Sequence, residues 1–415
     1  MGTPWRIKAL CLAGRVILEN GGETYRAEDT VIHMAQSLGL TEVDVFGVPS
    51  GLFISFTDET GERETSVCRV FPHGTHLARV DAVNQISRRL AAGDLAPAAL
   101  LSALKAAEAL GKGLSPWYAP MAAAFSALGF AVMFGGGWID MAVGAVCAAL
   151  TQLFPYMLRR HSSGTMTASL LGSLLCTLIP LLFHNLTGLG VTDAMVASAL
   201  MPLLPGLSMT NAVQDILRGD MVSGVTHGAR AVMVAALVAG GALVGTHLFS
   251  LMEPAMLPGV REAAEAGRPA ALWQAVSIAL SCFVAGVGFG ALLYAPRKAI
   301  FWGGLIGVAG YMSYWELIRL GAAESVSMFV GALLAAACAQ LAARRLRMIA
   351  TVFVTIAILP LVPGLGLYRA MSALAMGQIS GGLEIAAQTM ALILMIALGI
   401  GLGSAFLGAG RRLER

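Results

Sequence analysis

The last three quarters of this 415-residue chain carry very few charged side chains. Residues 111–415 hold 17 Lys or Arg and 11 Asp or Glu, whereas residues 1–110 hold 10 and 13. About one residue in four is charged in a soluble domain, and only the first block approaches this. The chain therefore combines a small soluble domain with a long membrane domain.

Composition also excludes several classes of protein. The net charge of +3 divides into −3 for the first block and +6 for the second, which leaves no basic face for nucleic acid. The six cysteines show no CxxC or Cys/His spacing, so we expect small buried residues and neither disulfides nor metal ligands. No GxxxxGK[ST] motif is present, which argues against an ATP-driven machine unless a partner supplies the nucleotide site. We expect no cofactor.

The front block has the pattern of a small α+β domain. Apolar residues at helical spacing, alternating apolar and polar residues, and Gly-rich breaks together predict seven elements. They are two helices, three short strands and two more helices, at 10–17, 24–38, 43–46, 52–56, 65–70, 77–90 and 96–110.

An enzyme is the main alternative for the front block. His73 and His76 lie near Ser66, Cys68 and Asp81 in the sequence, so a membrane-anchored hydrolase can be imagined. Their spacing matches no known catalytic pattern, and we interpret the histidines as loop residues without chemistry.

The second block contains ten candidate membrane spans of about the required 20 apolar residues. They lie at 117–136, 138–158, 166–188, 191–206, 229–251, 271–294, 299–318, 322–343, 348–363 and 383–408.

An internal repeat organises these spans. The short fourth and ninth spans end in Met-Pro-Leu-Leu-Pro-Gly (201–206) and Leu-Pro-Leu-Val-Pro-Gly (359–364), and the prolines and glycines match at an offset of 158 residues. The same offset places Gly224 on Gly382. We infer a duplicated five-span unit.

Because five is odd, two copies in series must face opposite ways, which predicts an inverted-topology repeat, a common transporter architecture. With the N-terminus inside, twelve Lys or Arg fall on the inner side and four on the outer side. The inner set is Arg159, Arg160, Arg218, Arg230, Arg297, Lys298, Arg344, Arg345, Arg347, Arg411, Arg412 and Arg415, and the outer set is Arg261, Arg268, Arg319 and Arg369. Positive charge favours the cytoplasm, so we expect both termini inside.

The repeated phrase also predicts a binding site. Proline interrupts a helix, and broken backbone is tolerated at membrane depth only in a protein interior or a wet cavity. Paired broken segments are the best sequence pointer to a transporter site. We therefore assign Pro205, Gly206, Pro363 and Gly364 to substrate binding, where half-helix N-termini suit a carboxylate.

Polar residues after the first break extend this site. Ser208, Asn211 and Asp215 share a helix face, and Asp215 or Asp220 could hold a proton, a cation or a substrate ammonium. The alternative is an Asp215–Arg218 surface pair. The second half keeps the break but has Arg369 where the first has Asn211.

One more acid belongs to the candidates. Glu384 begins the tenth span, with Gln388 one turn later. Because charge at bilayer depth is costly, we include Glu384, with Asp215 and Asp220, among the residues for proton or ion coupling.

The sequence resembles the threonine/serine exporter family over nearly its whole length. The resemblance rests on residues 13–26, 35–39 and 77–84, on 204–206 with 211–215 and 219–220, and on 360–364. The resemblance implies a soluble front plus five spans and a second five-span unit, here fused, and export of threonine and serine driven by the proton gradient or membrane potential. Some two-subunit relatives are instead associated with succinate, so a dicarboxylate exporter is the alternative.

We therefore predict a secondary exporter in a bacterial inner membrane whose partners are the lipid bilayer, a small carboxylated solute and protons or another ion. The oligomeric state, including a homo-oligomer, is left open. The predicted parts are a cytoplasmic domain, a first repeat, an external linker, a second repeat and a cytoplasmic tail, at 1–112, 113–252, 253–270, 271–410 and 411–415.

Overall fold

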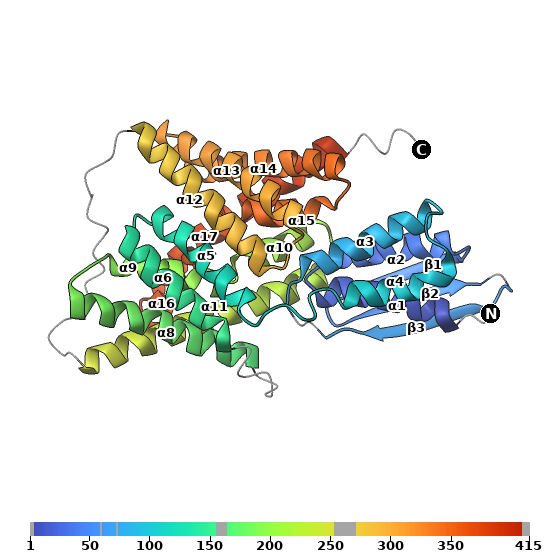
Figure 1. The fold of residues 1–415 in the computed structure, drawn as a ribbon, viewed down its shortest axis with the longest axis horizontal. Helices are drawn as coiled ribbons and strands as arrows, with labels where there is room; N and C mark the ends of the chain where they lie inside the picture. Colours follow the sequence, from blue (N-terminus) through green and yellow to red (C-terminus); the bar gives the residue numbers. More distant parts are fainter. Residues whose placement is uncertain (1–3, 59, 72–73, 155–163, 253–270, 409–415) are drawn as a thin grey trace.

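The computed structural model describes residues 4–58, 60–71, 74–154, 164–252 and 271–408. The predicted linker 253–270, the tail 411–415, His73 and several counted arginines, namely Arg159, Arg160, Arg261, Arg268, Arg411, Arg412 and Arg415, lie outside these residues. The soluble domain lies at one end of the long axis, and the apolar helices make up the rest (Figure 1).

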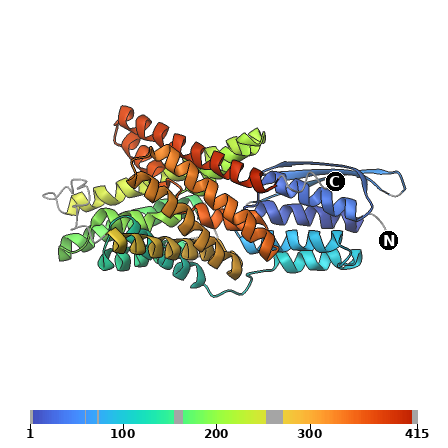
Figure 2. The ribbon, with the colours of Figure 1, turned by 90° about the horizontal axis from the view of Figure 1, so that it is seen from above.

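The front domain is the expected α+β unit. It comprises α1 (Pro4–Glu19), α2 (Thr24–Ser37), β1 (Thr41–Val48), β2 (Gly51–Thr57), β3 (Arg63–Arg69), α3 (Leu77–Ala91), a short 3₁₀ turn (Pro97–Ala99) and α4 (Leu100–Glu108). The strands form an antiparallel meander in the order β1-β2-β3. The sheet covers one side of α1 and α2, and α3 and α4 form the layer beyond them (Figure 2).

The sequence pattern explains the front-domain core. Alternation along β2 buries Leu52, Ile54 and Phe56 completely on one sheet face. Gly14 lets α1 approach this face, because a methyl group there would come 2.5 Å from Leu52 Cδ1.

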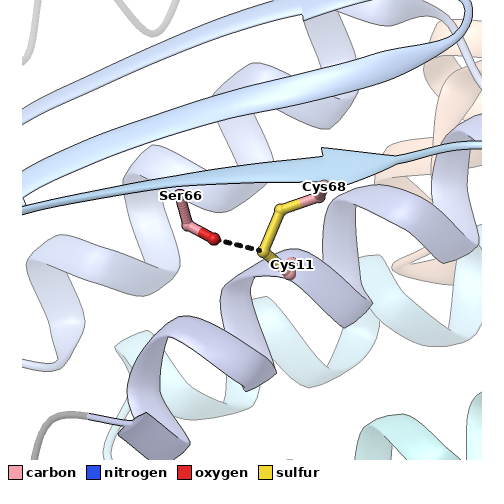
Figure 3. The surroundings of a disulfide bond; sticks show 3 residues. All are labelled: Cys11, Ser66 and Cys68. Atoms are coloured by element: carbon pink, nitrogen blue, oxygen red, sulfur yellow. Dashed lines mark hydrogen bonds between the residues drawn. A yellow bond between two sulfur atoms is a disulfide. The ribbon is translucent and has the colours of Figure 1, made fainter.

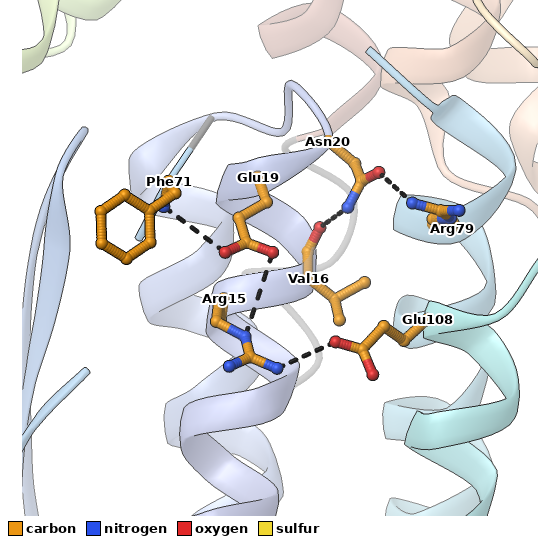
Figure 4. Close-up of polar contacts among 7 residues, drawn as sticks. All are labelled: Arg15, Val16, Glu19, Asn20, Phe71, Arg79 and Glu108. Atoms are coloured by element: carbon orange, nitrogen blue, oxygen red, sulfur yellow. Dashed lines mark hydrogen bonds and ion pairs between the residues drawn. The ribbon is translucent and has the colours of Figure 1, made fainter. Parts of the chain in front are cut away.

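Polar contacts join the helices of the front domain (Figure 4). Buried Asn20, at the end of α1, donates to the Val16 carbonyl at 2.7 Å and accepts from Arg79 of α3 at 3.1 Å. Arg15 of α1 pairs with Glu108 of α4 at 2.9 Å. These contacts fix α3 and α4 relative to α1, and α3 in turn reaches the membrane domain.

The expectation that no cysteine forms a disulfide is wrong. Cys11 on α1 and Cys68 on β3 are bonded, with their Cα atoms 5.6 Å apart, and Ser66 Oγ lies 3.8 Å from the Cys11 sulfur (Figure 3). The two cysteines are 57 residues apart and meet only because α1 packs on β3, so spacing could not reveal the pair. The other four are free thiols: Cys147, Cys176, Cys282 and Cys338.

Within the described residues, each of the ten predicted segments contains a helix, and one further helix follows each of the two breaks. They are α5 (Tyr118–Met133), α6 (Trp138–Thr151), α8 (Gly164–Thr187), α9 (Thr192–Leu200), a 3₁₀ turn (Met201–Leu203), α10 (Gly206–Leu217), α11 (Met221–Met252), α12 (Ala271–Leu292), α13 (Arg297–Arg319), α14 (Glu324–Leu346), α15 (Ala350–Ile358), α16 (Gly364–Ala375) and α17 (Ile379–Gly408).

Fewer of these helices meet the length and hydropathy expected of a span. Within the described ranges five do so, and a sixth span results if the α9 and α10 pair, bent by 49°, counts as one. Helices α5 and α6, with 16 and 14 residues, are shorter than the roughly 20 residues needed to cross a bilayer. The structure thus supports a polytopic helical membrane protein, while ten spans stay a prediction.

The helix bounds match the 158-residue offset found in the sequence. Helix α9 at 192–200 corresponds to α15 at 350–358, and α10 at 206–217 corresponds to α16 at 364–375. Packing follows the same rule: α8 packs on α11 as α14 packs on α17, and α10 packs on α17 as α16 packs on α11.

The first helices of the two units cross in an antiparallel sense. Gly129 of α5 lies against Ser281 and Ala285 of α12, whereas the earlier residue Ser126 lies against the later residue Gly288. Ser126 Oγ also donates to the Ala285 carbonyl at 3.3 Å. Glycine and serine allow this close approach of the two backbones.

The front domain docks on three turns of the membrane part. The amides of Leu77 and Ala78, at the start of α3, donate to the carbonyls of Leu293 and Tyr294 after α12, each at 3.0 Å. Asp81 of α3 accepts the amide hydrogen of Ile349, which precedes α15, at 3.2 Å.

Helix α2 makes the remaining docking contacts. Thr24 and Ser223 hydroxyls are 2.8 Å apart, and Arg218 lies 4.4 Å from the Tyr25 ring centroid. The front domain thus contacts three turns, at 218–223, 293–294 and 349–351. The distribution of Lys and Arg predicts that all three lie on the cytoplasmic side, like the front domain.

Candidate functional site

The two helix breaks meet at the centre of the membrane part. Proline cannot donate a backbone hydrogen bond, and α9 stops before Pro205 while α15 stops before Pro363. Gly206 begins α10 and Gly364 begins α16. A methyl group on Gly206 would come 3.2 Å from Gly364 Cα, so the two breaks are in contact through their glycines.

A small apolar cavity lies between the breaks, with a lining drawn from both units. Three pairs of lining residues are equivalent at the 158-residue offset, namely Met201 and Leu359, Leu204 and Val362, and Gly206 and Gly364. Phe130 of α5, Phe289 of α12 and Leu207 complete the lining. Of the predicted site residues, only Gly206 and Gly364 line this cavity, and Pro205 and Pro363 stand next to them.

The first N–H groups of any helix have no partner within the helix. Helices α10 and α16 both begin at the cavity, so their positive dipole ends lie at the same place. This arrangement can stabilise a negatively charged group.

The polar residues of α10 lie away from the cavity. Ser208 is exposed and Asn211 is half-buried. Asp215 is buried in the last turn of α10, where its Oδ2 lies 3.3 Å from Nδ1 of His227 on α11. The alternative pairing of Asp215 with Arg218 is wrong, since the Arg218 guanidinium instead lies over Tyr25.

Asp220 has a structural contact at the start of α11. Its Oδ1 accepts the amide hydrogen of Ser223 at 3.2 Å, as a helix-capping carboxylate does. The structure therefore places Asp215 and Asp220 at the front-domain end of α10 and does not bring them to the breaks.

The remaining candidates lie on exposed faces. Arg369 of α16 is exposed and its charge acts on Asp193, at the start of α9. Glu384 of α17 is exposed and accepts a hydrogen bond from Gln388 at 3.3 Å. Neither residue joins the cavity or the Asp215–His227 pair.

The junction with the front domain holds a second polar cluster. Glu23 and Arg26 are paired at 2.9 Å, and Thr351 of α15 accepts from Arg26 at 2.5 Å and donates to Glu23 at 3.0 Å. Burial raises the pKa of Glu23, but the charge and hydrogen bond of Arg26 outweigh it and leave that pKa below its usual value. Glu23 therefore stays ionised as a buried partner of Arg26.

The residues considered for a hydrolase have other partners. Cys68 is disulfide-bonded, and Asp81 accepts from Ile349 and, at 2.6 Å, from Gln85. The His76 ring stacks on Tyr294 at 4.9 Å. No nucleophile and base come together among the described residues of the front domain.

Two related family models match successive parts of the chain. Residues 8–249 match the family described as "Putative threonine/serine exporter", and residues 278–406 match that described as "Threonine/Serine exporter, ThrE". The chain belongs to the threonine/serine exporter family.

Two relatives extend the likeness over the whole chain. A "Probable threonine/serine exporter" of Mycobacterium tuberculosis is 27% identical over 412 residues, 95% of this chain and 76% of the relative. A "Threonine/serine exporter" of Corynebacterium glutamicum is 24% identical over 422 residues, 97% of this chain and 82% of the relative. No solved structure matches the chain.

The candidate site contains several residues that the sequence did not indicate. Phe130 and Phe289 are apolar and carry no chemical signal in the sequence. His227 lies twelve residues after Asp215, a separation at which two residues of one helix do not share a face. The turn between α10 and α11 brings the two side chains together. The sequence signal for His227 is its equivalent in the second repeat, which is Ile385.

Proposed function

We propose that this protein is a secondary exporter of the small amino acids threonine and serine, working by alternating access around the two breaks. The observation that carries this proposal is the meeting of both breaks at one cavity, lined by equivalent residues of the two units. A site shared between two repeats can open to either side when one repeat moves against the other. The names of the relatives supply the substrate class.

The cavity suits part of a small amino acid. Its walls are apolar, and the N-terminal ends of α10 and α16 place the positive ends of two helix dipoles beside a carboxylate. Pro205, Gly206, Pro363 and Gly364 would form this part of the site. Widening of the cavity towards α10 would add Ser208 and Asn211 for the polar groups of the amino acid.

The topology we propose is an inverted pair of five-span units in the bacterial inner membrane, with the front domain and both termini in the cytoplasm. The antiparallel crossing of α5 and α12 supports it, since a two-fold axis in the membrane plane reverses equivalent helices. The domain limits are those predicted from the sequence. Export would draw on the proton gradient or the membrane potential.

A dicarboxylate such as succinate is the alternative substrate. A dianion needs more positive charge than a zwitterion does, and Arg369 is the candidate that the second break provides. Because Arg369 is exposed and does not line the cavity, we prefer the amino acid.

Efflux from preloaded cells tests this function. We expect labelled threonine to leave cells that produce the protein, and to stop leaving when an uncoupler collapses the proton gradient. Labelled succinate serves as the comparison in the same cells. Efflux of succinate alone would identify the protein as a dicarboxylate exporter. Arg369 would then be the residue to mutate.

A further inference from the structure

Asp215 occupies an unfavourable place for a carboxylate. The residue is 3% exposed and lies in the last turn of α10, where the helix dipole places partial negative charge. Burial further disfavours an ionised carboxylate unless a positive charge accompanies it. Asp215 therefore needs a cation or a proton.

His227 is the group that meets this need. Within the described residues, its Nδ1 is the sole ion-pair partner of Asp215, at 3.3 Å, and the His227 side chain is 34% exposed. The Arg218 guanidinium, just after the end of α10, lies over the Tyr25 ring. The counter-charge of Asp215 is thus a titratable one with access to solvent.

Other titratable groups surround α10 on the elements packed against it. They are Arg230 on α11, Tyr368 and Arg369 on α16, and Glu384 on α17. Beyond the end of α10, Arg218 lies against Tyr25 of the front domain, which neighbours Glu23 and Arg26, and Asp220 lies near Glu28. Arg26 pairs with Glu23, and the Glu28 carboxylate accepts from the Gly47 amide at 2.6 Å.

The second repeat shows that the fold does not need the Asp215–His227 pair. At the 158-residue offset the equivalents are Ala373 and Ile385, so both members are apolar there. The packing is otherwise the same, because Gly224 of α11 lies against Ile216 of α10 just as Gly382 of α17 lies against Leu374 of α16. The first repeat has both members of the ion pair, and the second repeat has neither. This difference indicates that the pair serves function and not folding.

We propose that Asp215 and His227 together form the proton-binding site that couples export to the proton gradient. This inference rests on the proposed function and adds His227 to it. With one proton bound, an imidazolium faces the carboxylate and the pair is neutral overall. Loss of that proton leaves the buried carboxylate uncompensated, so proton release favours a conformation in which Asp215 reaches water or another cation. Proton exchange is thereby tied to the movement of α10.

Reconstituted full-length protein provides the test, and the second repeat supplies the variant. The double change Asp215→Ala with His227→Ile introduces the residues found at the equivalent positions of the second repeat, where the helices pack in the same way. We expect threonine transport driven by a pH gradient to fall more than tenfold. Exchange of threonine at equal concentrations and equal pH should persist, because it needs no net proton movement. His247→Gln, an exposed histidine on the same helix, is the matched control and should behave as wild type.

The remaining outcomes separate the two proposals. Wild-type vesicles that exchange no threonine would refute the proposed function itself. If wild type works and the double variant keeps its pH-driven transport, the pair is not the coupling site. Loss of exchange together with pH-driven transport, in a variant that elutes as a folded protein, would also overturn the coupling role, since the pair would then serve substrate binding.

Discussion

The two cavity glycines differ in how much space surrounds them, which leads to a prediction about single residues. A methyl group on Gly206 would come 2.4 Å from Val362 Cγ1, whereas one on Gly364 would come no closer than 3.3 Å to Leu204 Cβ. Overpacking costs about 1–3 kcal/mol, so we expect Gly206→Ala to reduce threonine efflux about tenfold or more and Gly364→Ala to reduce it less. Efflux measured at matched membrane abundance checks this order, and equal losses would contradict it.

His76 leads to a second prediction for a single residue. Neither ring nitrogen has a hydrogen-bond partner among the described residues, and burial, with the charge of Arg79, lowers the pKa of His76 to about 4. The unfolded state therefore binds a proton below about pH 6.5 that the folded state does not bind until about pH 4. Stability should fall as the pH drops through this window, by about 1 kcal/mol once solvent screening is considered. His76→Phe keeps a ring on Tyr294 and should remove this component of the pH dependence of thermal unfolding.

At the scale of the elements, α15 is capped by a side chain from a different domain. The Asp81 carboxylate accepts the Ile349 amide hydrogen just before α15 begins. Removing a cap costs about 1 kcal/mol, so Asp81→Ala should lower the thermal unfolding midpoint and loosen the front domain. Asp81→Asn retains an acceptor and should lose much less. Hydrogen exchange of the amides at the start of α15 measures the difference, and identical exchange in both variants would disprove the cap.

The elements also show what the sequence could and could not predict. The Pro-x-x-Pro-Gly phrases predicted the breaks that end α9 and α15 and start α10 and α16, because proline and glycine act on their own stretch of backbone. Such local effects do not predict which elements contact one another. Cys11 meets Cys68, and Asp215 meets His227, only through packing of separate elements, so one disulfide was excluded wrongly and one ion pair was missed.

At the scale of the whole molecule, equivalent positions should face opposite sides of the membrane. Leu189 and Arg347 are equivalent at the offset of 158, as are Leu217 and Ala375, and all four are exposed. After substitution by cysteine in intact cells, an impermeant maleimide should label positions 189 and 375, and should label 347 and 217 only after permeabilisation. Labelling of both members of a pair from one side would refute the inverted repeat.

The front domain bridges the two units at this scale. The chain connects it to the first unit, yet α3 binds the second through Leu293, Tyr294 and Ile349. Thr24 and Tyr25 of α2 contact the first unit at Ser223 and Arg218. A relative movement of the two units must therefore change one of these sets of contacts.

The bond between Asp81 and Ile349 has a consequence for biosynthesis. A ribosome adds about 5–20 residues per second, so on the order of tens of seconds pass between the emergence of the front domain and that of its partner in the second unit. During that time the face of α3 that will be buried is exposed, and Leu77 has no carbonyl to receive its amide hydrogen. Docking of the front domain thus requires that translation has passed Ile349, and a chain truncated before this residue would display an unfilled surface.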